Sequence, residues 1–214
     1  RWFNRRIFEQ NVSLLEKKIR FVFQFIYGCP GDTYGSFRDG LKWAVEHDRD
    51  VWFDRLRVLP GTIYRQRPER FGLCFDHKRP NYVVSSNTFS DHDLERAERL
   101  KRGFLLYTYR RALDLPLLQR FLKFCSTIDL IEAFGDWCWF HQPHETLDLA
   151  RRDPADVPES FLRELSAWIG RFVQSRRLVS WADYLQLQRS RQVRFVWANR
   201  PESREGGFRD ARGN

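Results

Sequence analysis

The chain has 214 residues, a formal net charge of +9 and 42% hydrophobic residues, including 19 Phe, 8 Trp and 7 Tyr. This apolar content is enough for a buried core and excludes a wholly disordered chain. No apolar run reaches the roughly 20 residues that a membrane-spanning helix needs, so we expect no membrane partner. The four cysteines are far apart in the sequence, which argues against a disulfide framework and for a cytoplasmic location.

The chain contains no methionine, not even at position 1, and it begins in a segment with helical spacing. Four apolar residues near the start recur every three or four positions, which predicts a helix with one apolar face. They are Phe8, Val12, Leu15 and Ile19. We therefore expect the chain to be a piece of a longer protein whose N-terminal part is missing.

Two segments in the first third of the chain are typical of buried β strands. Residues 21–27 and 51–59 are rich in aromatic and β-branched residues, and each ends at a turn of proline and glycine. Asp32 and Thr33 are placed to cap a helix between the two segments. Because both strands are too apolar to be half solvated and a helix connects them, we predict parallel strands with a right-handed crossover.

The chain becomes mainly helical after the second strand. Thr62 is expected to cap a short helix that Gly72 closes, and Ser90 begins the cap of a long helix. Later apolar clusters also have helical spacing, and we predict helices in each of them. These clusters lie at residues 117–124, 128–140, 161–173 and 181–187.

The sequences at the ends of the two predicted strands resemble those of a known protein family. Residues 24–37, with the sequence QFIYGCPGDTYGSF, resemble the fifth strand and following turn of radical SAM enzymes, in the form found in the subgroup with a cobalamin-binding domain. Residues 58–62 look like the turn after the sixth strand of that subgroup. Residues 71–73, 82–84 and 88–90 are similar to the segments that leave its barrel. The order and spacing of these fragments together make the resemblance specific.

The resemblance implies an α/β fold followed by a mainly α region. Residues 1–75 would form the last strands and helices of a partial (β/α) radical SAM barrel, and residues 76–89 an irregular connector. A helical C-terminal domain would follow at 90–197, where residues 128–137 resemble a domain of unknown role found on some of these enzymes. Residues 198–214 would form a basic tail.

The resemblance also implies a function. Enzymes of this family use a 4Fe–4S cluster to cleave S-adenosylmethionine to a 5′-deoxyadenosyl radical, and the cobalamin, where used, commonly relays a methyl group. The cluster needs three cysteines at the spacing CxxxCxxC. Gaps of 45, 51 and 13 positions separate the four cysteines here, so the ligands of the cluster and of cobalamin would lie in the missing N-terminal part. We expect the chain alone to be catalytically inactive and, with its strand edges unpaired, poorly soluble. Its substrate is unknown.

Five residues are candidates for binding S-adenosylmethionine. In a parallel barrel, ligands gather at the carboxyl ends of the strands, where glycine lets the backbone approach a ligand closely. An isoleucine at this edge offers an apolar surface for an adenine ring. The candidates are Gln24, Ile26, Gly28, Leu59 and Pro60. Gln24 stands where the family's GxIxGxxE pattern has its first glycine, so its role stays open. The catalytic residues are unknown, and no residue is assigned as a metal ligand.

Three other groups of side chains each have two interpretations. Cys29 follows the first strand and is either a space-filling residue or a thiol that faces the reaction. Asp54 and Arg55 are adjacent in the second strand, so one of them must face inward as a ligand contact or as part of a satisfied core pair. A further group is either a metal site or the polar end of a helix. It consists of Cys138, His141, His144 and Glu145.

The basic composition supports an alternative function of a different class. A chain with net charge +9 and many aromatic residues is compatible with a basic helical interaction module that binds RNA and has no catalytic activity. Its 37 cationic residues are scattered among 28 acidic ones rather than gathered in one segment, which makes nucleic acid the less favoured partner.

Overall fold

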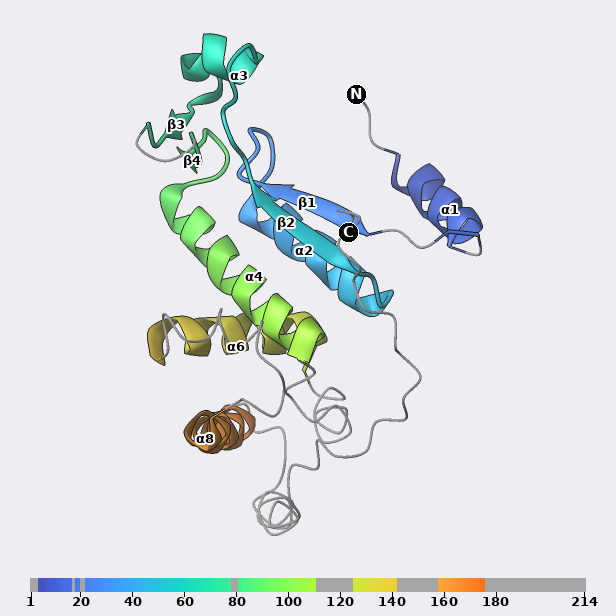
Figure 1. The fold of residues 1–214 in the computed structure, drawn as a ribbon, viewed down its shortest axis with the longest axis vertical. Helices are drawn as coiled ribbons and strands as arrows, with labels where there is room; N and C mark the ends of the chain where they lie inside the picture. Colours follow the sequence, from blue (N-terminus) through green and yellow to red (C-terminus); the bar gives the residue numbers. More distant parts are fainter. Residues whose placement is uncertain are drawn as a thin grey trace, which may run out of the picture.

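The computed structural model describes residues 4–16, 18–19, 22–77, 81–110, 125–141 and 158–175. Helices predominate, two strands form each of two small sheets, and the described residues form no closed barrel (Figure 1). The elements in chain order are α1 (Arg5–Leu15), β1 (Phe23–Tyr27), α2 (Tyr34–Glu46), β2 (Val51–Arg55), α3 (Ile63–Gln66), a 3₁₀ turn (Pro68–Phe71), β3 (Cys74–Phe75), β4 (Val83–Ser85), α4 (Asp91–Arg110), α6 (Thr127–His141) and α8 (Glu159–Ser175). The mixed α/β class is therefore confirmed, and the partial barrel stays a prediction.

The first sheet is the predicted parallel pair. β1 pairs with β2 in parallel along the full length of both strands, and α2 connects them. β2 ends at Arg55, so the predicted strand 51–59 is too long. The chain leaves the sheet there because Arg57 forms an isolated antiparallel bridge with Tyr82, in the segment before β4.

The start of α2 and its close contact with β1 both follow from local residues. Thr33 Oγ1 accepts a hydrogen bond from the Ser36 backbone N–H at 3.1 Å, and Ser36 Oγ accepts one from the Thr33 N–H at 2.9 Å. This capping box confirms Thr33 as the predicted cap. A Cβ atom at Gly40 would lie only 2.5 Å from the Phe25 ring, so a glycine is needed where α2 packs on the sheet.

The long helix α4 begins as predicted and then crosses α6 at two glycines. Ser90 Oγ accepts a hydrogen bond from the Asp93 N–H at 3.1 Å and so caps α4. At the crossing, a Cβ atom on Gly103 would lie 2.3 Å from the Ile131 carbonyl oxygen, and one on Gly135 would lie 2.1 Å from a backbone carbonyl oxygen of α4. The two helix backbones are thus in direct contact, and Figure 1 shows α6 running across the C-terminal half of α4.

One hydrophobic core joins the sheet to the helices. The ring centroid of Phe53 on β2 lies 6.2 Å from that of Phe37 on α2 and 5.4 Å from that of Phe104 on α4. Buried residues of α6 belong to the same cluster. This core crosses the predicted boundary between residues 1–75 and 90–197, so the described parts of both segments share one apolar interior.

A second cluster of buried residues joins α6 to α8. The indole rings of Trp137 and Trp168 stack with centroids 5.6 Å apart, and Phe134 lies 5.5 Å from Trp168. Leu165 on α8 is completely buried in this cluster. The helices predicted at 128–140 and 161–173 are therefore confirmed, with α8 packed by its aromatic face.

The region between β2 and α4 contains more regular structure than the sequence predicted. β4 lies within residues 76–89, for which we expected an irregular connector, and pairs in antiparallel fashion with β3 just before them. Gly72 closes the 3₁₀ turn in the left-handed conformation, as expected. Thr62 occupies the N-cap position of α3 as predicted, but its hydroxyl donates to the Leu59 carbonyl oxygen at 2.7 Å and makes no cap hydrogen bond to the helix.

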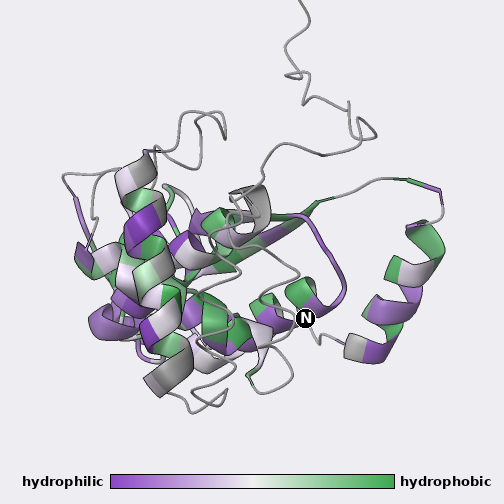
Figure 2. Ribbon diagram, turned by 90° about the horizontal axis from the view of Figure 1, so that it is seen from below, coloured by the Kyte–Doolittle hydropathy of each residue, from purple (hydrophilic) through white to green (hydrophobic). Residues whose placement is uncertain are grey.

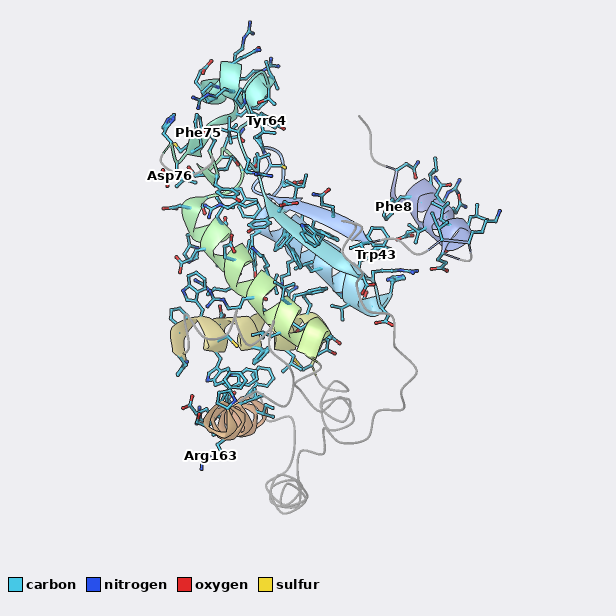
Figure 3. All side chains as sticks on the ribbon, viewed as in Figure 1. Phe8, Trp43, Tyr64, Phe75, Asp76 and Arg163 are labelled. Carbon is cyan, nitrogen blue, oxygen red and sulfur yellow. The ribbon has the colours of Figure 1, made fainter. Side chains whose placement is uncertain are left out.

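α1 is confirmed as a helix, but its predicted apolar face is only partly buried. Phe8 and Trp43 point toward each other between α1 and α2 (Figure 3), with ring centroids 5.7 Å apart, and Val12 is also buried. Leu15 and Ile19, the other two residues of the predicted apolar face, are about half exposed. Figure 2 shows α1 standing apart from the other elements, so its contact with α2 is made by the side chain of Phe8.

Several predictions fall on residues outside the described ranges. These are the helices at 117–124 and 181–187 and the tail at 198–214. Among the described helices, none combines the length and the apolar character required to cross a membrane.

Candidate functional site

The two faces of the β1–β2 sheet differ in exposure, and this difference defines the candidate site. Side chains alternate between the faces, so Phe25 and Phe53 pack against the helices on the covered face. The other face, which we call the open face, consists of Gln24, Ile26, Trp52 and Asp54. The side chains of Ile26 and Trp52 are 47% and 57% exposed, so this face offers apolar and polar groups to a ligand.

A hydrogen bond between side chains links the two strands across the open face. Gln24 Nε2 donates to Asp54 Oδ2 at 2.6 Å. In the strand register Gln24 lies opposite Trp52 and Ile26 lies opposite Asp54, so the bond runs diagonally. Gln24 and Ile26, two of the predicted site residues, are thus neighbours on this face, and Gln24 holds a carboxylate in place.

The neighbouring residue Arg55 points to the covered face. Its Nε donates to the Val83 carbonyl oxygen at 2.8 Å, and its Nη1 lies 4.0 Å from a Glu98 carboxylate oxygen. Of the two adjacent charged residues in β2, Asp54 is therefore the one on the open face, and Arg55 fastens β2 to β4 and α4.

The glycine-containing turn after β1 packs against α4 in the interior of the protein. Gly28 has φ +85° and is buried, and a Cβ atom there would lie 3.0 Å from Leu94 Cδ2. Gly31, with φ +95°, donates its N–H to Thr88 Oγ1 at 2.8 Å. The positive φ explains why glycine is required at both positions. Gly28 therefore fits against α4, and its predicted contact with a ligand stays a prediction.

Leu59 and Pro60 lie beyond the end of β2, in the turn before α3. Both are exposed, Leu59 by 51%, and the Leu59 carbonyl oxygen accepts the hydroxyl of Thr62. The five predicted site residues therefore fall into three places: two on the open face, Gly28 inside the turn after β1, and these two in the later turn.

Cys29 is a half-buried thiol at the end of β1. Burial and the nearby Asp32 carboxylate raise the pKa of Cys29 to about 11, so the thiol is protonated at neutral pH. Burial also raises the pKa of Asp32, and burial together with Cys29 and Asp32 raises that of Tyr64. A protonated thiol is a weak nucleophile, which supports the space-filling interpretation of Cys29.

The candidate metal group receives no support from the described part of the chain. Cys138 is completely buried, and burial raises the pKa of its thiol. His141 Nδ1 lies 3.1 Å from the Trp137 carbonyl oxygen, while His144 and Glu145 lie outside the described residues. Within the described ranges, no three His, Cys, Asp or Glu side chains are arranged to hold a metal ion.

Two charged networks that the sequence did not predict fasten the helices to the sheet. In the first, Glu132 on α6 accepts hydrogen bonds from Tyr34 Oη at 2.6 Å and Arg38 Nε at 2.8 Å, and the Arg96 guanidinium lies 3.8 Å from the centre of the Tyr34 ring. Burial alone would raise the pKa of Glu132, but the hydrogen bonds from Tyr34 and Arg38 outweigh it and lower the pKa. The Glu132 carboxylate therefore stays charged to a lower pH than an ordinary glutamate does.

The second network lies at the carboxyl end of β1 on the covered face. The Tyr27 hydroxyl donates to Glu98 on α4, and Lys101 Nζ lies 3.1 Å from the other Glu98 oxygen and 3.2 Å from the Tyr27 hydroxyl. Burial raises the pKa of Tyr27, and the Glu98 charge adds to this effect. The spacing of Glu98 and Lys101 on one helix face was the available sequence signal, but their partner on β1 could not be read from it.

Comparisons with known proteins add no assignment to this geometry. No family model matches the chain, and no curated protein sequence matches it. The resemblance to radical SAM enzymes thus stays a prediction carried by the motifs at the strand ends, and the functional argument depends on the parallel sheet and its open face.

Proposed function

We propose that this chain supplies one wall of the S-adenosylmethionine pocket of a cobalamin-dependent radical SAM enzyme. The single observation that carries the proposal is the sheet itself: two adjacent parallel strands are covered by helices on one face and are left bare on the other by every element that the structure describes. Parallel strands are ordinarily buried on both faces, so a bare face implies that a ligand or further polypeptide lies against it. The motifs at the strand ends favour the nucleoside of S-adenosylmethionine as that ligand.

The residues of the open face suit a nucleoside. Ile26 presents an exposed apolar side chain near the carboxyl end of β1, and this is the surface that an adenine ring needs for one of its faces. The strand backbone ends there at the glycine turn, where loop amides and carbonyls become available for polar contacts. Ile26 would therefore orient the base, and Leu59 would extend the apolar wall if the turn before α3 closes over it.

The chemistry of cleavage would come from groups that this chain does not supply. The 4Fe–4S cluster provides the electron that cleaves S-adenosylmethionine, but no set of three ligands for it exists among the described residues. The contribution of the chain under this proposal is thus binding and orientation, together with the exclusion of water from one side of the nucleoside.

The ion pairs that several arginines form with carboxylates favour this proposal over a basic RNA-binding module. Arg38, Arg96 and Arg99 each pair with a carboxylate of α6, Arg99 with Asp136 at 2.7 Å, and Arg99 also lies 2.8 Å from Glu95 on its own helix. Guanidinium groups that neutralise carboxylates within the protein contribute less to phosphate binding.

The proposal is tested by titrating the full chain with 5′-deoxyadenosine, a neutral nucleoside, by equilibrium dialysis or NMR. We expect saturable binding by the wild type and at least about tenfold weaker binding by Ile26→Asp, because the substitution replaces the apolar surface with a charge. Ile7→Asp is the matched control, since Ile7 is 52% exposed on α1, and it should bind as the wild type does. No saturable binding by the wild type, or equal losses in both variants, would contradict the proposal.

A further inference from the structure

We propose that the open face also binds an organic cation, a guanidinium or alkylammonium group, between the ring of Trp52 and the carboxylate of Asp54. Gln24 acts as a positioning residue, because it holds that carboxylate through its hydrogen bond. This site shares the sheet face with the proposed nucleoside site but does not depend on it. The expected ligand is a small cationic molecule or a cationic side chain of a substrate.

The strand geometry brings the two groups together. Trp52 and Asp54 are two residues apart on β2, so their side chains leave the same face with Cα atoms about 6.6 Å apart. A cation within about 6 Å of an indole ring is attracted by the ring, and a carboxylate at the same distance adds charge–charge attraction. A single guanidinium or ammonium group placed above the strand can therefore contact both.

The charge of Asp54 is not neutralised within the described part of the protein. Its hydrogen-bond partner there, the Gln24 amide, is uncharged, and no described Lys, Arg or His forms an ion pair with it. In contrast, Glu98 and Glu132 each lie beside two cationic side chains. The bond from Gln24 reaches Oδ2, which leaves Oδ1 available to a ligand. Charge complementarity therefore selects a cation for this face.

The exposed indole supports the same ligand. Trp52 is 57% exposed although the strand neighbour on the covered face, Phe53, is packed among aromatic rings. Ile26 lies directly opposite Asp54 and forms an apolar border to the carboxylate. An aromatic ring, a positioned carboxylate and an apolar border on one rigid strand pair together match the chemistry of an organic cation.

The test is an NMR titration of the full chain, observed at the indole Nε1–H signal of Trp52 and assigned with Trp52→Phe. The probes are N-acetylargininamide and tetramethylammonium, with N-acetylcitrullinamide as the neutral counterpart of the first. We expect both cations to shift the Trp52 signal saturably and the citrulline compound to leave it unchanged. Tighter binding of the arginine compound would identify guanidinium as the preferred group, and tighter binding of tetramethylammonium would identify alkylammonium.

Three variants separate the roles of the residues. Asp54→Asn should weaken cation binding at least about tenfold, and Gln24→Leu should weaken it about threefold, because the carboxylate remains but is no longer held. Asp39→Asn is the matched control, because Asp39 is an exposed carboxylate on α2, and it should have no effect. The methyl region of each spectrum reports whether the variant retains the native fold.

Two results would overturn the proposal. One is equal binding of the cationic and neutral probes or no saturable shift with any of them. The other is unchanged cation affinity in a folded Asp54→Asn variant. Because 5′-deoxyadenosine carries no charge, a chain that binds the nucleoside but not the cations would refute this site alone, and the reverse result would refute only the proposed function.

Discussion

The covered and open faces of the β1–β2 sheet come from the same ten residues but have different roles. On the covered face Phe53 meets the rings of three other phenylalanines, whereas on the open face its neighbour Trp52 is 57% exposed. Apolar residues occupy five of the six positions on the covered face but only two of the four on the open face, so the open face is the more polar of the two. The distinguishing feature is the Gln24–Asp54 pair, since a polar pair is placed where water or a ligand reaches it.

The strongest test of the covered face is a substitution in the helices that support it. Gly135→Ala should destabilise the protein by about 3 kcal/mol or more, because the new Cβ would clash with the α4 backbone. Gly35→Ala on α2 is the control, because a Cβ there would meet only Thr33 Oγ1, at an ordinary contact distance of 3.6 Å, and its expected effect is below about 1 kcal/mol. Urea denaturation measures both. Equal stability of the two variants would show that α4 and α6 do not cross in contact.

Truncation of adjacent side chains on β2 compares the two faces directly. Phe53→Ala should cost about 3 kcal/mol of unfolding free energy, since it leaves a cavity among packed rings. Trp52→Ala should cost less than about 1 kcal/mol, because the indole is mostly exposed. Urea denaturation of both variants gives the difference, and a larger loss for Trp52→Ala would mean that the open face is in fact buried.

Glu132 provides a pH-dependent test of how α6 is held to the covered side. Glu132→Gln should destabilise the protein by about 1 to 2 kcal/mol at pH 7, because the charge that Arg38 and Arg96 neutralise is lost. The pKa of Glu132 is lowered in the folded state, so its contribution is complete above the ordinary value of about 4.3 and is lost as pH falls below it. Unfolding measurements from pH 7 to pH 3 should therefore show the two proteins converging. A difference that stays constant over this range would contradict the assigned role of the carboxylate.

The smallest expected effect is on the rate at which Cys29, just beyond the end of β1, is alkylated. With a pKa raised to about 11, its alkylation by iodoacetamide should be slow at pH 7 and should accelerate about tenfold per pH unit up to that value. Peptide mass spectrometry follows the modification of this one cysteine, with Cys29→Ser identifying its peptide. Rapid alkylation at pH 7 would show that the thiol is more open to solvent than the structure places it.

Local signals in the sequence predicted much of the fold. Thr33 and Ser90 cap α2 and α4 as expected because capping depends on residues within one turn of the helix. The parallel pairing of β1 and β2 also followed from the strand composition and the helix between them. The antiparallel pair β3–β4 was missed because two strands of two and three residues leave almost no periodicity to detect.

The candidate site was less predictable because it depends on register. Gln24 and Asp54 are 30 positions apart, and only the pairing of Ile26 with Asp54 brings their side chains within hydrogen-bond distance. A shift of one residue would have placed Asp54 on the covered face and Arg55 on the open one. The surroundings of Gly28 were also not predictable. We expected a ligand beside this glycine, but the space there is occupied by Leu94, which is distant in sequence.

The contact of backbone on backbone between α4 and α6 has a mechanical consequence. No side chain separates Gly103 on α4 from the backbone carbonyl of Ile131 on α6, so neither helix can slide along the other without atoms overlapping. The Tyr27 hydroxyl at the end of β1 is hydrogen-bonded to Glu98 on the same α4, so a displacement of that strand end would be transmitted to α4 and, through the backbone contact, to α6. The indole of Trp137 on α6 stacks on that of Trp168 on α8, so the fluorescence of this pair would report such a displacement.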